Sequence, residues 1–426
     1  MHARAARRVT PSRPLAGVLV LALVAGTASI VAAVAPIAPA RADSIRDAQY
    51  WLDSLGISEA WNTTRGEGVM IAIIDSGIDA GHPDLRGAVV GGTDVSGAGS
   101  ASGAPVAGSA HGTMVASLAA GRGSSAGSGV IGAAPEASIL SVSLSFGAGK
   151  RPGDAQVADG VVWAVDHGAD IISLSLTRNQ LDWPESWDEA FLYAEQNDVV
   201  VVAAAGNRGS GTDQVGAPAT IPGVLAVGGI NRAGSASDVA STEGITIGVV
   251  APSENLVGAV PGGGHRYWQG TSGATPIVAG IAALVRAAHP ELSAAAVIDR
   301  IVRSADPVTS AVPDPEYGYG VVDAREAVEA SIAEATVNPL GSIEEWIAVH
   351  RRGDAEARVV ELLPAREGLG RQPHTSLMDA LPVPPWALVE LTRVLPGLLV
   401  LGGTLLALLA LAIAGGLRFV ASRRTQ

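Results

Sequence analysis

The hydrophobic pattern of residues 43–335 alternates between two kinds of segment. Short, mostly apolar runs occur at residues 68–75, 137–144, 171–176, 199–205 and 224–227. Longer stretches of helical character separate them, at residues 112–120, 155–167, 185–197 and 274–289. Strands that are apolar on both faces and alternate with helices are typical of a parallel sheet covered on both sides. The pattern therefore predicts an α/β fold with a mainly parallel sheet.

Four polar residues lie where these elements begin or end. Asp75 ends the first strand, and Asn207 follows the strand at 199–205. His111 precedes the helix at 112–120, and Ser272 lies in the Gly-Thr-Ser-Gly turn before the helix at 274–289. Each has an ordinary structural interpretation: an acid that caps a turn, a Gly-Asn turn, a surface histidine and a helix N-cap. However, parallel sheets bind ligands at the carboxyl ends of their strands, where Asp75 and Asn207 are expected.

A serine at the start of a helix can also be a nucleophile. Backbone N–H groups and the positive end of the helix dipole are available there to a developing oxyanion. Serine needs a base, and the base needs a group that orients it, for which His111 and Asp75 are the candidates. The amide of Asn207 is a candidate donor to the oxyanion. His82 is a rival base, but the Pro83-Asp84 that follows it indicates a turn.

The order Asp75, His111, Ser272 and the motifs around these residues resemble the subtilase family of serine proteases. The matching motifs are Ile-Ile-Asp-Ser-Gly-Ile-Asp at 73–79, His-Gly-Thr-Met-Val-Ala at 111–116, Ala-Ala-Gly-Asn at 204–207 and Gly-Thr-Ser-Gly-Ala-Thr-Pro at 270–276. Supporting matches extend the resemblance over about 260 residues, and several motifs in order are more specific than any one alone. The resemblance implies a subtilisin-like three-layer fold and a serine endopeptidase.

The resemblance also implies a role for each residue. Asp75 would orient and stabilise the imidazole of His111, and His111 would remove the proton of Ser272 and later protonate the leaving amine. Asn207 and the backbone N–H of Ser272 would hold the oxyanion. Substrate would bind along two segments that comprise Ser173, Leu174, Ser175, Ala204, Ala205 and Gly206.

Two departures from the family pattern bear on this site. Gly273 stands where the family usually has Met or Phe, which predicts a looser nucleophile turn that lacks a packing side chain. Thr177-Arg178 stands where the family commonly has Gly-Gly, which predicts a reshaped primary pocket.

The two ends of the chain carry targeting patterns. Residues 1–42 combine a basic start, an apolar run and Ala-Arg-Ala before Asp43, which predicts a secretory signal cut after Ala42, with an uncleaved anchor as the alternative. Residues 336–393 are charged and contain several prolines, which predicts a tether with a short helix at 343–350. The uncharged residues 394–417 are long enough to span a bilayer. The basic tail at 418–426 indicates a cytoplasmic C-terminus and an extracytoplasmic peptidase domain at 43–335.

The net charge and the absence of cysteine exclude some classes of partner and of chemistry. The formal charge is −13, and loss of a leader with five arginines and no acid would take it to −18, which argues against nucleic acid as a partner. Cysteine is absent, so disulfides and thiolate chemistry are excluded. The implied chemistry requires no cofactor. Subtilases often bind structural calcium, for which Asp79, Asp84 and Asp94 offer oxygen ligands, but no metal is assigned.

A finer resemblance is to the mycosins, the membrane-anchored subtilases of type VII secretion systems. The short lead Gln49–Ile57, with Ala60-Trp61, is similar to the segment that wraps the mycosin domain. The order of signal, subtilase, tether, single helix and basic tail is also the mycosin layout. It implies a membrane-bound protease that processes secreted or envelope proteins, and a type VII secretion complex as a partner. The alternative is an assembly subunit of such a complex for which proteolysis is not required.

Overall fold

The computed structural model describes residues 44–98, 100–106, 108–146 and 151–351. Within them, seven strands form a sheet of order β2-β3-β1-β4-β5-β6-β7, and every neighbouring pair is parallel. The strands are β1 (Met70–Asp75), β2 (Val89–Asp94), β3 (Ser138–Ser143), β4 (Ile171–Leu174), β5 (Val200–Ala204), β6 (Leu225–Ile230) and β7 (Ile247–Pro252). The mainly parallel α/β fold is thus confirmed. The predicted signal, the apolar span at 394–417 and the tail lie outside the described residues.

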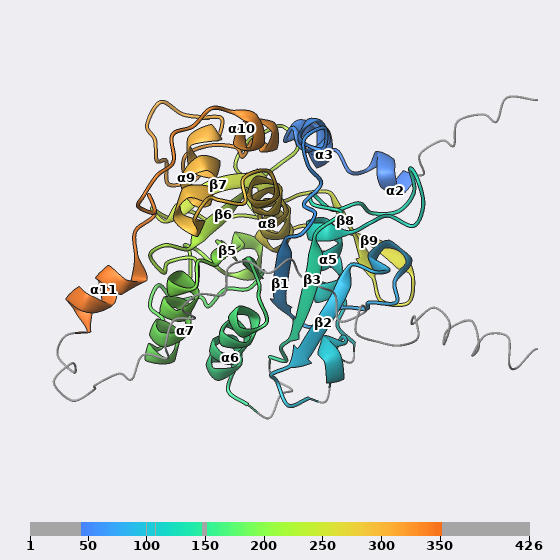
Figure 1. The fold of residues 1–426 in the computed structure, drawn as a ribbon, viewed down its shortest axis with the longest axis horizontal. Helices are drawn as coiled ribbons and strands as arrows, with labels where there is room; N and C mark the ends of the chain where they lie inside the picture. Colours follow the sequence, from blue (N-terminus) through green and yellow to red (C-terminus); the bar gives the residue numbers. More distant parts are fainter. Residues whose placement is uncertain (1–43, 99, 107, 147–150, 352–426) are drawn as a thin grey trace, which may run out of the picture.

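Helices cover both faces of this sheet (Figure 1). Successive side chains of a strand point to opposite faces, so Ile71 and Ile73 of β1 join one core and Ala72 and Ile74 join the other. The first core contains α5 (His111–Ala120), α8 (Thr271–Ala288), α9 (Ala294–Ser304) and α10 (Ala324–Glu329). The second contains α6 (Gly153–Asp166) and α7 (Glu185–Gln196). Because both cores are apolar, the strands read as continuous apolar runs in the sequence.

Three neighbouring strands end at the same edge of the sheet. β1 pairs with β4 and β4 with β5, and these strands end at Asp75, Leu174 and Ala204. On the face above them, α5 begins at His111 and α8 begins at Thr271. The topology therefore brings the carboxyl ends of strands and the amino ends of two helices to one place.

The apolar pattern did not predict β2, β7 or the antiparallel hairpin of β8 (Leu256–Val260) and β9 (Gly264–Trp268). β2 is an edge strand with two glycines and is mostly half-buried, so it lacks a continuous apolar run. In β9, every residue is exposed or half-buried, and Trp268 packs against the first core. Glycine interrupts the apolar runs of β7 and β8.

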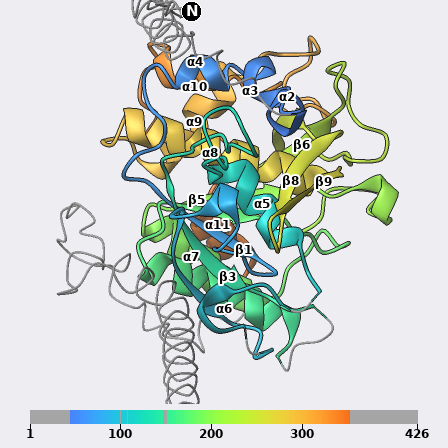
Figure 2. The ribbon, with the colours of Figure 1, turned by 90° about the vertical axis from the view of Figure 1, so that its right-hand side faces the viewer.

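The N-terminal segment packs over the helices of the first core (Figure 2). It contains α2 (Ser44–Asp47), α3 (Trp51–Ser54) and α4 (Ile57–Ala60), and the side chains of Trp51 and Ile57 are fully buried. The Gln49 amide exchanges hydrogen bonds with the backbone of Ile131 at 2.7 and 3.0 Å. These contacts fix the segment to the loop that follows α5.

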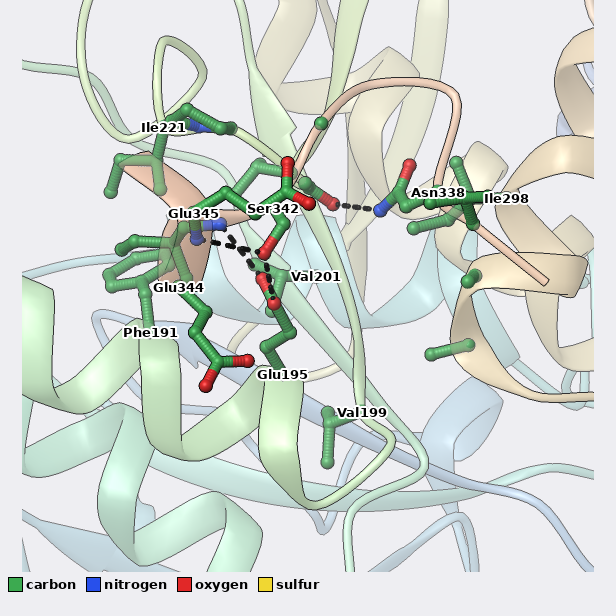
Figure 3. Close-up of a pocket in the computed structure, with 18 of the residues that line it drawn as sticks. Phe191, Glu195, Val199, Val201, Ile221, Ile298, Asn338, Ser342, Glu344 and Glu345 are labelled. Atoms are coloured by element: carbon green, nitrogen blue, oxygen red, sulfur yellow. Dashed lines mark hydrogen bonds between the residues drawn. The ribbon is translucent and has the colours of Figure 1, made fainter. Parts of the chain in front are cut away.

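The residues that follow α10 in the chain also pack on the domain. The helix expected at 343–350 is present as α11 (Ile343–His350), and Ile343 is buried beside α7. Glu195 of α7 accepts hydrogen bonds from Ser342 Oγ at 2.5 Å and from Ile343 N at 2.9 Å (Figure 3). A cavity of about 360 Å³ lies between this segment, α7 and α9 (Figure 3). The first part of the predicted tether is therefore docked rather than extended.

One helix in the described part of the chain, α8, has the length and apolar composition that a membrane span requires. Its side chains are almost all buried between the sheet and its neighbours, so its apolar character reflects its place in the core.

Candidate active site

Asp75 and His111 form a tight pair at the edge of the sheet. Asp75 is the last residue of β1 and is almost fully buried, whereas the His111 side chain at the start of α5 is 38% exposed. Nδ1 of His111 lies 2.9 Å from Oδ1 and 2.8 Å from Oδ2 of Asp75. Oδ1 also accepts a hydrogen bond from the N–H of Ser76 at 2.6 Å. Because the Nδ1–H group donates to the carboxylate, the neutral imidazole carries its lone pair on Nε2, which can therefore act as a base.

Two opposing effects act on the pKa of His111. Burial disfavours the charged imidazolium and lowers the pKa, whereas the charge of Asp75 and the hydrogen bond to it favour the charged form. The two contributions of Asp75 together exceed that of burial, so the pKa of His111 lies above its ordinary value. A base of this kind binds a proton more readily than free histidine.

Ser272 lies in the first turn of α8, but its hydroxyl is not directed at the base. Ser272 Oγ donates to the carbonyl oxygen of Ser175 at 3.2 Å, and Ser175 Oγ donates to the carbonyl oxygen of Ser272 at 2.9 Å. Among the described side chains, no hydrogen bond joins Ser272 Oγ to His111. Hydrogen bonds of this kind often tighten only when substrate binds.

Asn207 is held with its amide N–H₂ group available. Its Oδ1 accepts hydrogen bonds from Thr271 N at 2.8 Å and from Thr271 Oγ1 at 3.3 Å. The backbone N–H of Thr271 can only donate, so the amide oxygen faces Thr271 and Nδ2 faces away. Gly270 has φ 138°, which favours glycine, and a Cβ there would lie 3.3 Å from Asn207 Oδ1. The turn before Ser272 thus fixes the donor as well as the nucleophile.

The start of α8 supplies a second donor beside Asn207. The N–H groups in the first turn of a helix have no partner within the helix, and Ser272 is the second residue of α8. The positive end of the helix dipole lies at the same point. These features suit stabilisation of a negatively charged oxygen next to the Ser272 hydroxyl.

The predicted substrate residues divide into two groups. Ser175 contacts Ser272, and Gly206 hydrogen-bonds through its N–H to Thr271 Oγ1 at 3.2 Å, so both lie beside the nucleophile. The side chains of Ser173 and Leu174 are fully buried within β4, and those of Ala204 and Ala205 are buried at the end of β5. These four buried side chains pack inside the domain at the carboxyl ends of β4 and β5. A substrate could therefore reach only the backbone of these segments.

A groove beside the Asp75–His111 pair extends the site. Its cavity measures about 570 Å³, and it runs from His111 to Ser175 and Thr177. Apolar side chains line much of it, namely Val106, Leu144, Phe146 and Leu176, of which Phe146 is 61% exposed. Sequence reasoning missed these residues because a single exposed aromatic residue after a strand gives no motif.

The expectation of a loosened turn at Gly273 is wrong. Gly273 is buried, and a Cβ at this position would lie 2.3 Å from Leu256 Cδ1 and 3.3 Å from Trp268 Cζ2. Side chains from β8 and β9 therefore fill the space that the family's larger residue would take. The sequence alone did not reveal this, because the two filling residues lie on the hairpin that the apolar pattern missed.

Of the candidate calcium ligands, Asp84 has neighbours that could ligate a metal. His82, Asp84 and His265 place their ligand atoms within 4.8 Å of one another. However, His82 Nδ1 accepts from Asp84 N at 3.1 Å, and His82 Nε2 faces the carbonyl oxygen of Gly264 at 3.0 Å. His265 Nε2 lies 2.7 Å from Asp84 Oδ2. Since both nitrogens of His82 already have partners, the cluster fits a hydrogen-bonded clamp better than a metal site.

Comparisons with known proteins agree with this geometry. A family model described as the subtilase family matches residues 66–320. A subtilisin of Bacillus pumilus is 36% identical over 268 residues, which cover 62% of this chain and 92% of that protein. The structure of MycP1 from Mycobacterium smegmatis is similar with a TM-score of 0.59 and 30% identity, and the match covers 72% of this chain and 89% of that one. A structure of MycP1 from the ESX-1 type VII secretion system has the same TM-score and identity, with coverage of 72% and 90%.

Proposed function

Because this chain belongs to the subtilase family of serine proteases, we propose that it is a membrane-anchored, extracytoplasmic serine endopeptidase that processes secreted or envelope proteins in type VII secretion. The observation that carries the catalytic part is the meeting of Asp75, His111, Ser272 and Asn207 at one edge of the sheet. The contacts of His111 with Asp75 and of Asn207 with Thr271 support it.

The roles of these residues follow from their contacts. Nε2 of His111 takes the proton of Ser272 Oγ while Oγ forms a bond to the scissile carbonyl carbon. The carbonyl oxygen becomes an oxyanion that accepts hydrogen bonds from Asn207 Nδ2 and Ser272 N. The C–N bond then breaks as His111 returns the proton to the leaving amine. A water molecule, deprotonated by His111, hydrolyses the acyl-enzyme by the same route.

The membrane anchor and its orientation are supported by the sequence pattern of residues 394–417 and of the basic tail. The natural absence of cysteine allows a direct test by single substitutions in the full chain. A membrane-impermeant maleimide applied to spheroplasts should label Ser331→Cys, in the exposed part of the peptidase domain, and should label Ser422→Cys only after lysis. Labelling of Ser422→Cys in intact spheroplasts would contradict the proposed topology.

The secretion context is supported by the similarity to MycP1 of the ESX-1 system. The alternative, an assembly subunit, is favoured by one observation: in this structure the Ser272 hydroxyl donates to Ser175 O instead of to His111. Ser272→Ala in the full chain separates the two functions. Loss of secretion equal to that of the gene deletion supports a proteolytic role, whereas full secretion by the variant supports assembly.

A further inference from the structure

Trp268, the last residue of β9, contacts the candidate catalytic histidine His111 through its indole ring. Its indole and the His111 imidazole have centroids 5.6 Å apart, and their planes are inclined by 83° in an edge-to-face arrangement. Trp268 is half-buried and packs against the first core. Edge-to-face pairs are attractive beyond the area that they bury, so the indole restrains the imidazole as well as covering it.

The contact between Trp268 and His111 depends on the absence of a side chain at Gly273, the residue after Ser272. A side chain at residue 273 would come close to both Leu256 and Trp268, as the distances from its hypothetical Cβ show. The residue after Ser272 therefore has no side chain at the position where the indole packs. In this chain, the wall beside the nucleophile comes from β9 instead of from α8.

The hairpin that carries Trp268 is fixed at both ends. At its turn, His265 pairs with the buried Asp84 at 2.7 Å and Gly262 N donates to Asp79 Oδ2 at 2.9 Å. Just beyond its base, Gly270 N donates to the carbonyl oxygen of Ser253 at 2.8 Å. Opposite His265, the N–H of Ala259 donates to Ser117 Oγ of α5, the helix that begins with His111. The hairpin and the catalytic histidine are therefore attached to the same helix, which leaves the indole little freedom to move away.

We propose that Trp268 is a positioning residue for the peptidase reaction. Its indole holds the His111 ring in the plane that Asp75 requires and keeps water from that side of the ring. Asp75 of β1 is the charged group that faces the imidazole. On the hairpin, His265 is paired with Asp84, and Arg266 and Tyr267 are exposed.

The test compares Trp268→Ala, Trp268→Phe and Tyr267→Ala in the full chain, with pH profiles of kcat and kcat/KM. Trp268→Ala should lower kcat by about 10- to 100-fold, since a small displacement of a catalytic group has effects of this size. It should also move the acid limb to higher pH, because removal of the indole relieves the burial that opposes imidazolium. Trp268→Phe should retain kcat within about threefold through its own edge contact. Tyr267→Ala, which alters the exposed neighbour, should stay within about twofold of the wild type.

A loss of kcat with an unmoved acid limb, or an unchanged kcat in Trp268→Ala, would overturn the proposal. Proton NMR of the His111 Nδ1–H signal tests the same contact without turnover, so the inference stays separable from the proposed function. The signal should exchange faster with water in Trp268→Ala than in Trp268→Phe and the wild type. Equal exchange in all three proteins would overturn the proposal as well. If Trp268→Ala does not fold, Trp268→Leu replaces it with the same expectations.

Discussion

The two halves of the catalytic site differ in how far they are assembled. In the acid–base half, the imidazole of His111 contacts both oxygens of a buried carboxylate and makes an edge-to-face contact with Trp268. In the nucleophile half, Ser272 and Ser175 exchange hydrogen bonds, and the hydroxyl points to a backbone carbonyl. The difference indicates that the fold sets the base in advance, whereas the Ser272 hydroxyl must exchange the Ser175 carbonyl oxygen for His111 as its acceptor.

The physical reason for this difference lies in the elements that carry each residue. Asp75 belongs to a central strand, so its position is fixed by the sheet and by hydrogen bonds at the strand end. Ser272 has a fixed backbone at the start of α8, but its hydroxyl group can rotate, and it donates to the Ser175 carbonyl oxygen. Substrate that displaces the Ser175 carbonyl as acceptor would leave His111 as the partner for Ser272.

The largest expected effect comes from breaking the acid–base half. Asp75→Asn retains the shape but presents an N–H₂ or a neutral oxygen to Nδ1, which removes the preference for the productive tautomer. We expect kcat/KM to fall by about 10⁴-fold, the size of effect that loss of this group has in serine proteases. Steady-state kinetics on a peptide substrate measure it. Asp182→Asn, an exposed acid, is the matched control and should leave kcat/KM unchanged.

The next largest effect comes from the oxyanion donor. Asn207→Leu removes Nδ2 and should lower kcat by about 10²–10³-fold with little change in KM, because the donor acts mainly in the transition state. Asn62→Leu, at an exposed position, serves as the control. A fall in affinity with kcat retained would mean that Asn207 binds the ground state instead.

The raised pKa of His111 predicts the pH dependence of both activity and stability. The base must be neutral to accept a proton, so the acid limb of kcat/KM should lie above the ordinary value of about 6.5. Below that limb the rate should fall about tenfold per pH unit. The same shift stabilises the fold fully below the unfolded value, and this contribution is lost as the pH rises through the folded value. An acid limb at or below 6.5 in Ser272-dependent hydrolysis would contradict the pairing with Asp75.

The smallest expected effect concerns the nucleophile half. Ser175→Ala removes the hydrogen bond to the carbonyl oxygen of Ser272 but keeps the Ser175 carbonyl that Ser272 contacts. A typical hydrogen bond contributes about 0.5–1.5 kcal/mol, so kcat/KM should change by roughly two- to tenfold. Ser210→Ala, on an exposed turn, is the control. A loss as large as that of Asp75→Asn would mean that both halves are equally rigid.

The sequence predicted the positions of the candidate catalytic residues better than it predicted their surroundings. Asp75 ends a strand with a continuous apolar run, Asn207 follows another, and His111 and Ser272 lie at the starts of helices, so the local pattern placed them at the ends of elements. Their catalytic roles came from the family resemblance and stay a prediction. The contact of Trp268 with His111 and the space at Gly273 depend on a hairpin with exposed faces, which no apolar run marks. The hydrogen bonds from the start of α11 to Glu195 likewise join residues about 150 positions apart. The pattern of either segment alone does not indicate that the two are in contact.

Whether His111 activates Ser272, although no hydrogen bond joins the two in this structure, is tested by labelling of the full chain with a fluorophosphonate probe. Wild type, Ser272→Ala and His111→Ala are compared at a pH above the acid limb, with the labelled residue identified by mass spectrometry. We expect labelling at Ser272 in the wild type and its loss in both variants. Equal labelling of His111→Ala and the wild type, or no labelling of the folded wild type, would contradict it.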